Sequence, residues 1–428
     1  MSNLQNPDLS VQFVGIRSPN PFWLSSGPPT NTAGQVMRAF DAGWGGAVWK
    51  TIGVQVRNTT SRYSAVSLGR RRMMGFSNIE LISDRPVEDN LREIKAVKQK
   101  YPNNALIVSL MVESKREAWH EIVRRAEDAG ADGVELNFGC PHGMNERGMG
   151  SAVGQVPEYT EMITAWAKEA ARVPVLVKLT PNITDIRATA RAAKQGGADA
   201  ISAINTINSI TGIDLDTLDP RPTVDGHSTH GGYCGPAVKP IALNMVGECV
   251  KETALPVSGI GGIANWRDAA EFMLMGCGTV QVCTAVMHHG FGIVDGMKKK
   301  LAEWMRSKDF TRIDDFRGQT LERVTDWKSL NQDYRIVARI NEQTCIGCGL
   351  CYTACQDGAY QCIYMDRIAN GNDDFAGPDG AVPMAKIPRV DEPACVGCNL
   401  CALVCPVDNC VEMVEVGAEV CAAQAVKV

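Results

Sequence analysis

Several features are missing from this sequence, and each absence narrows the range of functions. No apolar run approaches the ~20 residues that a helix needs to cross a membrane. Residues 1–8 lack the basic and then apolar pattern of a signal peptide. The net charge of −5 is spread over both signs, so no basic stretch indicates a nucleic-acid-binding surface. We therefore expect a cytoplasmic protein that binds neither a membrane nor nucleic acid.

The cysteines are the first unusual feature of the composition. The chain of 428 residues is too long for one ordinary core and predicts a large domain and a small one. Of its 16 cysteines, 5 precede residue 300 and 11 follow residue 341. In a cytosolic protein, crowded cysteines indicate metal binding or catalysis rather than disulfides. The C-terminal part is therefore expected to bind metal.

Two cysteine runs, starting at Cys345 and Cys395, share the C-x2-C-x2-C-x3-C spacing of bacterial ferredoxins. Three thiolates at this spacing can wrap one face of an iron–sulfur cubane, and the fourth reaches across to the other cluster. Zinc sites use two pairs of ligands, which is a different pattern. We predict two [4Fe–4S] clusters, one bound by Cys345, Cys348, Cys351 and Cys405, the other by Cys395, Cys398, Cys401 and Cys355.

A few residues near these runs depart from the motif or have no place in it. Gln356 follows Cys355 where the run usually has proline, but it is not a ligand. Cys362, Cys410 and Cys421 lie outside both runs. We interpret these three as packing residues near the clusters, because cysteine often behaves as a small apolar side chain.

The first 300 residues alternate short apolar runs with amphipathic helical stretches. Several helices end in glycine just before an apolar run, which is a helix-to-strand signal. Eight strands are predicted, at residues 22–26, 46–51, 106–111, 133–138, 175–179, 200–206, 256–260 and 279–284. Eight such units over ~250 residues indicate an α/β fold of the (β/α)8 TIM-barrel type, with a doubly wound sheet as the alternative. We expect the barrel over 1–305, a linker over 306–335 and a ferredoxin-like domain over 336–428.

Polar residues and glycines collect where the predicted strands end, which is where TIM barrels carry their active sites. The last two strand ends are rich in glycine and predict a phosphate site, because backbone N–H groups can close around the phosphate. The sequence has no complete G-x-G-x-x-G fingerprint, so we do not predict a dinucleotide-binding fold. A lysine in the barrel mouth, Lys50 or Lys178, would stabilise the anionic edge of a reduced flavin. The strand-end residues are Ser25, Ser26, Lys50, Thr51, Asn137, Lys178, Asn205, Thr206, Gly261, Gly262, Cys283 and Thr284.

A glycine-rich segment at the end of the fourth predicted strand, residues 137–150, is interpreted as a mobile lid that carries the catalytic acid. Cys140 stands at its start. A neutral thiol, with a reference pKa near ~8.5, can donate a proton near neutral pH. The alternative is that Cys140 is a small buried apolar residue. His142 is a rival acid, but its position favours a role in orienting the loop.

Several amide side chains lie near the predicted strand ends. Carboxamides donate and accept hydrogen bonds together, so asparagines suit a neutral ring that carries carbonyls and N–H groups side by side. The candidate residues for binding such a ring are Asn78, Asn137, Asn205 and Thr206.

These stretches resemble the dihydropyrimidine dehydrogenase family, and especially the smaller, FMN-carrying subunit of the bacterial NAD-dependent enzyme. The resemblance covers nearly the full length, including residues 77–83, 137–150, 178–182 and both cysteine runs. It implies that Cys140 gives a proton to C5 of uracil or thymine, that hydride passes from FMN N5 to C6, and that Asn78, Asn137, Asn205 and Thr206 hold the base. The FMN site that it implies is formed by Ser26, Gly27, Lys50, Thr51, Lys178, Gly235, Gly261, Gly262, Cys283 and Thr284.

The resemblance also implies a partner, because the chain has no nicotinamide site of its own. A flavoprotein subunit with FAD and NAD would pass electrons to the two clusters and on to FMN, in a hetero-oligomer. Two other hypotheses stay open. One is an enzyme similar to dihydroorotate dehydrogenase, and the other is an electron-transfer subunit whose barrel is inactive.

Overall fold

The structure is a computed structural model and describes residues 6–68, 71–368 and 385–416. The chain divides into two compact units, Met1–Val324 and Thr325–Val428. Residues 306–324, which we expected to be part of a linker, belong to the first unit. Ile313 and Phe316 explain this, because both side chains are buried in the core of that unit.

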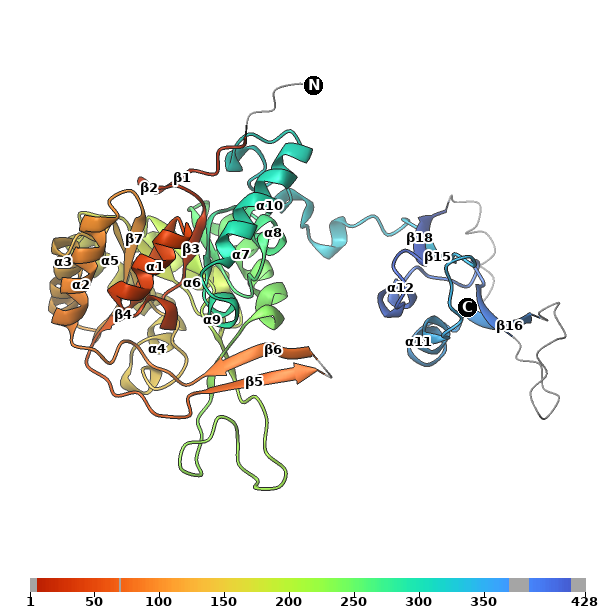
Figure 1. Ribbon diagram of the computed structural model, residues 1–428, viewed down its shortest axis with the longest axis horizontal. Coiled ribbons are helices and arrows are strands. Elements are labelled where there is room, and N and C mark those ends of the chain that lie inside the picture. The colour runs from red at the N-terminus through yellow and green to blue at the C-terminus, as the bar shows by residue number, and fades with distance from the viewer. Residues whose placement is uncertain (1–5, 69–70, 369–384, 417–428) are drawn as a thin grey trace. The chain divides into compact units, whose positions relative to one another are not determined.

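The first unit is built on a closed barrel of eight parallel strands (Figure 1). Each strand pairs with the next along the chain, and the last pairs with the first. This confirms the TIM barrel and excludes the doubly wound alternative, whose sheet would stay open. The strands are β3 (Phe22–Leu24), β4 (Gly46–Gly53), β7 (Ala105–Met111), β8 (Gly133–Asn137), β9 (Val175–Lys178), β10 (Ala200–Ala203), β13 (Val257–Ile260) and β14 (Cys277–Val282).

Amphipathic helices cover the outside of the barrel and bury one face against it (Figure 1). They are α1 (Ala33–Ala42), α2 (Val87–Lys100), α3 (Arg116–Asp128), α5 (Pro157–Ala170), α6 (Ile186–Gln195), α7 (Lys239–Thr253), α8 (Trp266–Leu274) and α10 (Ile293–Ser307). Among the helices that the structure describes, none combines the length and apolarity of a membrane span.

A repeated Gly-Ala-Asp sequence carries the chain from a helix into a strand at residues 130–132 and 197–199. In both copies the glycine has a left-handed φ, 95° and 88°, which ends the helix without strain. The Asp199 carboxylate then accepts from Val175 N and Lys168 Nζ, each at 2.7 Å. Asp132 makes the same pair of contacts with Leu106 N and a lysine of α2. Each aspartate therefore holds the start of the neighbouring barrel strand in place.

The two ends of the barrel are closed differently. At the N-terminal end of the strands, β1 (Val11–Phe13) and β2 (Ile16–Ser18) form a hairpin that buries Phe13 and Ile16. At the other end, insertions after β4 and β10 form a four-stranded antiparallel sheet. The hairpin of this sheet that follows β4 projects from the barrel in Figure 1. That sheet consists of β5 (Tyr63–Leu68), β6 (Arg71–Asn78), β11 (Ile207–Ser209) and β12 (Gly231–Cys234).

The second unit contains two similar halves. In one half, β15 (Ile336–Ile340) leads into the first cysteine run and α11 (Leu350–Gly358). In the other, β17 (Ala385–Val390) leads into the second run and α12 (Leu400–Val404). Antiparallel pairs join the halves: β15 with β18 (Val411–Glu415), and β17 with β16 (Ile363–Ile368).

Candidate active site and cluster sites

A cavity of about 1260 Å³, including its open mouth, lies at the C-terminal ends of the barrel strands. The structure brings every residue that we predicted for the base and the flavin into its lining. These residues are Cys140, Asn78, Asn137, Asn205, Thr206, Ser26, Gly27, Lys50, Thr51, Lys178, Gly235, Gly261, Gly262, Cys283 and Thr284. Their individual roles stay predictions, whereas their convergence is a property of the fold.

A ladder of hydrogen bonds crosses the floor of this cavity. Asn205 Nδ2 donates to Asn137 Oδ1 at 2.9 Å, and Asn137 Nδ2 donates to Thr51 Oγ1 at 2.9 Å. Thr51 Oγ1 lies 3.1 Å from Ser26 Oγ. Each amide is thus held in one orientation by its neighbour. The ladder presents a fixed set of donors and acceptors to whatever binds above it.

Glycines shape the part of the cavity that we predicted to hold phosphate. Gly235, Gly261 and Gly262 have φ values of 92°, 132° and 74°. A Cβ atom on Gly262 would lie 2.8 Å from Lys239 N and 2.9 Å from Gly235 O, so no side chain fits there. Lys239 N is the first amide of α7. Backbone N–H groups at a helix start suit a phosphate group, such as that of FMN.

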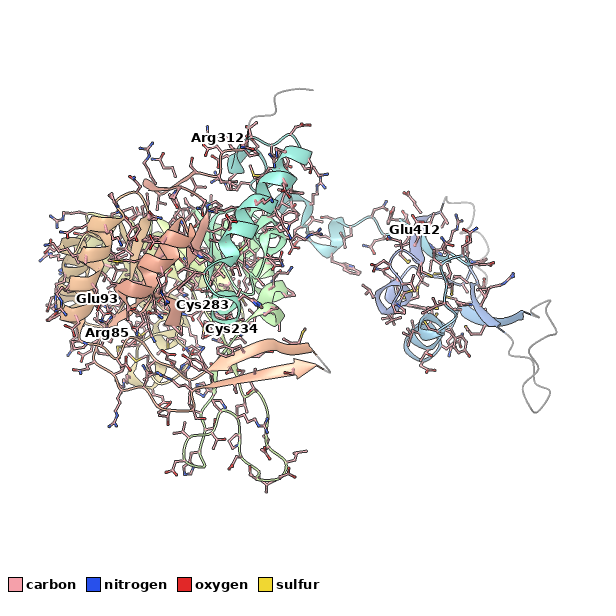
Figure 2. All side chains as sticks on the ribbon, in the orientation of Figure 1. Arg85, Glu93, Cys234, Cys283, Arg312 and Glu412 are labelled. Atoms are coloured by element: carbon pink, nitrogen blue, oxygen red, sulfur yellow. The ribbon has the colours of Figure 1, made fainter. Side chains whose placement is uncertain are left out.

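The last strand ends earlier than expected. We predicted a strand over 279–284, but β14 ends at Val282, and α9 (Thr284–His289) begins immediately afterwards. Cys283 therefore stands at the junction, and its thiol interacts with that of Cys234 (both labelled in Figure 2). Thr284 Oγ1 lies 3.1 Å from Cys234 Sγ. Burial raises the pKa of Cys283 to about 12 and that of Cys234 to about 11, so both thiols stay neutral near pH 7.

Each of the two lysines in the cavity faces a carboxylate. Lys50 pairs with Glu80, which also accepts from Tyr63. Lys178 Nζ lies 3.8 Å from Glu135 Oε1, which is beyond hydrogen-bond distance. Within the part of the chain that the structure describes, the Lys178 ammonium has no hydrogen-bond acceptor although its side chain is only 6% exposed. An electron-rich ring edge in the cavity would supply the missing acceptor, and this fits FMN.

Sequence reasoning missed Glu80 and Glu135. Glu135 is fully buried inside the barrel, where Gln281 Nε2 donates to its Oε2 at 3.2 Å. The signal that could have found it is a charged residue in the middle of an otherwise apolar strand, since such a group is buried only with a partner. Glu80 lies in a segment with no regular pattern, so only the fold reveals its contact with Lys50.

Cys140 is buried at the start of the glycine-rich loop, with 8% of its surface exposed. Its Sγ lies 3.5 Å from the His142 carbonyl. Burial raises the pKa of the Cys140 thiol to about 11, against an ordinary value of 9.0, so the thiol keeps its proton near neutral pH. The His142 ring contacts Glu80 O at 3.1 Å through Nε2, and its Nδ1 is buried with no partner in the described residues. Burial lowers the pKa of His142, which favours the neutral ring.

The second unit has one cavity for each predicted cluster. Each cavity is lined by the four cysteines that we assigned to one cluster, together with one further cysteine. With the open solvent at their mouths included, the cavities measure about 330 and 310 Å³. Among the described residues, no three potential ligands lie close enough together to hold a single metal ion. The sets are Cys395, Cys398, Cys401, Cys355 with Cys362, and Cys345, Cys348, Cys351, Cys405 with Cys410; Cys421 lies outside the described residues.

Comparison with known proteins defines the class to which this architecture belongs. Residues 8–305 match the model of the dihydroorotate dehydrogenase family, and residues 338–413 match that of the 4Fe-4S dicluster domain. The chain resembles the solved dihydroorotate dehydrogenase of Eimeria tenella in complex with ferulenol, with a TM-score of 0.61. That likeness covers 74% of this chain and 90% of the other, but the 18% identity makes it evidence for the fold alone.

Curated relatives narrow the class further. The chain is 42% identical to the NAD-dependent dihydropyrimidine dehydrogenase subunit PreA of Escherichia coli, over 83% of this chain and 87% of the relative. It is 45% identical to the chloroplastic dihydropyrimidine dehydrogenase (NADP(+)) of Arabidopsis thaliana, over 74% and 78%. The catalytic subunit of dihydroorotate dehydrogenase B from Pyrococcus horikoshii is 36% identical, over 73% and 98%. The chain belongs to the dihydropyrimidine dehydrogenase family, an oxidoreductase family whose barrel implies FMN and whose dicluster domain implies iron–sulfur clusters.

Proposed function

We propose that this chain reduces the 5,6 double bond of uracil or thymine in pyrimidine catabolism, as the catalytic subunit of an NAD-dependent dihydropyrimidine dehydrogenase. The observation that supports this best is the convergence of a buried thiol and a fixed ladder of amides in one cavity. The names of the relatives from Escherichia coli and Arabidopsis thaliana agree with this substrate class.

The amides would bind and orient the base. Asn137 and Asn205 present donors and acceptors at fixed positions, and Asn78 and Thr206 extend this polar surface along the cavity wall. A neutral ring with alternating carbonyl and N–H groups can satisfy both kinds of group at once. A base seated here would need no charged partner, and the buried amide groups would discriminate against rings that leave them unpaired.

Cys140 would then complete the reduction. Addition of hydride to C6 leaves negative charge at C5, which must take up a proton. The Cys140 thiol donates that proton to C5 and regains one from solvent before the next turnover. Bound FMN would supply the hydride. Lys178 and Lys50 would hold the ring of that cofactor, and the glycines at 235, 261 and 262 would make room for its phosphate.

Electrons would reach the barrel through the two [4Fe–4S] clusters of the second unit. Their source in this proposal is a separate flavoprotein subunit that carries FAD and NAD, so the active enzyme is a hetero-oligomer. The word "subunit" in the name of the relative from Escherichia coli supports the existence of a partner. Co-purification under anaerobic conditions, followed by NADH-dependent uracil turnover, would test this part of the proposal.

The reductive half-reaction can be tested without the partner. The chain is purified anaerobically with FMN and iron, reduced with dithionite, and mixed with uracil, thymine or orotate. We expect uracil or thymine to reoxidise the flavin, and Cys140→Ala to retain FMN and iron but lose most of this reaction. Faster reaction with orotate would favour the dihydroorotate dehydrogenase alternative, which the match to the subunit from Pyrococcus horikoshii keeps open. A chain that never retains FMN would favour the electron-transfer alternative.

A further inference from the structure

The two halves of the second unit carry equivalent cysteines that belong to neither ligand set. Asp391 N donates to Cys362 O at 2.8 Å, and in the other half Asn341 N donates to Cys410 O at 2.8 Å. Each of these cysteines directly precedes a strand, β16 or β18. Both side chains are buried, and each lines the cavity of one cluster. A fifth thiol thus lies beside each set of four ligands.

The surroundings of these two thiols differ. Cys362 Sγ lies 3.6 Å from Sγ of the ligand Cys355, and Cys362 N also donates to that sulfur at 3.3 Å. Cys410 Sγ instead lies 3.7 Å from the carbonyl of Asn341, and no contact with the ligand Cys405 is found among the described residues. Within residues 6–68, 71–368 and 385–416, the Cys362 thiol thus has a contact with a ligand sulfur that has no counterpart at Cys410.

The missing proline of the first cysteine run accounts for this difference. Pro406 follows Cys405 in the second run, and α12 ends just before it. Gln356 takes the corresponding place after Cys355, so α11 continues to Gly358 before the chain returns. Gln356 Nε2 donates to Ile363 O at 2.8 Å and holds the returning strand against the helix. This hydrogen bond brings Cys362 next to Cys355.

We propose that Cys362 donates a hydrogen bond to the Cys355 thiolate and so raises the reduction potential of the cluster bound by Cys395, Cys398, Cys401 and Cys355. A cysteine bound to iron has lost its proton, so the S–H of Cys362 is the donor of the pair. Reduction makes the cluster more negative, and hydrogen bonds to its sulfurs stabilise that state. The cluster beside Cys410 lacks this bond. The inference rests on the clusters and not on the identity of the base.

Redox titration of the anaerobically purified full chain, followed by EPR, tests this proposal. A weak hydrogen bond corresponds to about a threefold change in the ratio of reduced to oxidised cluster at a fixed solution potential. We expect Cys362→Ala to lower one midpoint potential by that amount, about 28 mV for a one-electron couple. Cys362→Ser, which keeps a donor, should restore the potential, whereas a packing role would not predict this rescue. The matched control Cys410→Ala should leave both potentials unchanged.

Three results would overturn the proposal. The first is a Cys362→Ala variant with full iron content in which both midpoint potentials are unchanged. The second is a Cys410→Ala variant in which a midpoint potential shifts by the same amount as in Cys362→Ala. If Cys362→Ala loses iron, Gln356→Leu is measured in its place, because it loosens the tie to Ile363 without altering the thiol. Unchanged potentials in that variant would be the third contrary result. None of these results depends on whether uracil is the substrate.

Discussion

Raising the pH tests the proton donor directly, because the burial of Cys140 sets the pH at which its proton is lost. With a pKa of about 11, about 99% of the Cys140 side chains would still be thiols at pH 9. A thiol at the ordinary value of 9.0 would be about half deprotonated there. A raised pKa keeps the acid protonated at higher pH. Loss of the Cys140 proton should therefore not lower the rate of uracil reduction through pH 9, whereas at higher pH ionisation of the uracil ring lowers the rate as well.

The assay is anaerobic stopped-flow mixing of the dithionite-reduced chain with uracil, with flavin reoxidation followed between pH 7 and pH 10. Cys140→Ala should be slower at every pH by about 10²- to 10⁴-fold, the usual contribution of a general acid. A wild-type rate that halves below pH 9, where the uracil ring is still mostly neutral, would refute the argument that burial shifts the pKa of this thiol. A variant as fast as the wild type would refute the assignment of Cys140 as the acid.

A second measurement of the same pKa needs no substrate. Alkylating reagents react with the thiolate, and at pH 8 a pKa of about 11 leaves about 0.1% of Cys140 in that form. An ordinary thiol would be about 10% thiolate, so Cys140 should react with iodoacetamide at least about 100-fold more slowly than a free-cysteine standard, because burial also restricts access of the reagent. Mass spectrometry of the peptide that contains Cys140 gives the rate. Labelling as fast as the standard would contradict the raised pKa.

Four further predictions concern the flavin, the barrel and the clusters. Gly262→Ala should cost about 1–2 kcal/mol through its left-handed backbone and the crowded start of α7, and the purified chain should carry less FMN. Glu135→Gln should raise the flavin midpoint potential, measured by dye-equilibrated titration, because the charge of Lys178 is then no longer offset. An unchanged potential would contradict that role. Asp199→Ala should cost about 1–3 kcal/mol, seen as a lower melting temperature, because it leaves the Val175 amide at the start of the neighbouring strand β9 without its acceptor. Cys395→Ala should lower iron content by up to half.

The strands of the barrel and the presence of a dicluster domain could be predicted from the sequence alone, and the ligand sets of the clusters stay a prediction from the same source. Strand and helix periodicity act over a few residues, and so do the Gly-Ala-Asp stops, which is why all eight strands could be placed. The cysteine runs are equally local, since three of the four ligands of each set lie within seven residues. The contrast between Gln356 and Pro406 is also visible in the sequence, but its effect on Cys362 is not.

Tertiary structure decided everything that depends on residues far apart in the chain. Closure of the barrel brings Asn137 and Asn205 into one ladder although 68 positions separate them. It also pairs Lys178 with Glu135 and buries Cys140 deeply enough to change its pKa. A local pattern can state that a residue is apolar, acidic or basic. The cost of desolvating a group depends on the neighbours that the folded chain places around it, and those neighbours come from distant strands.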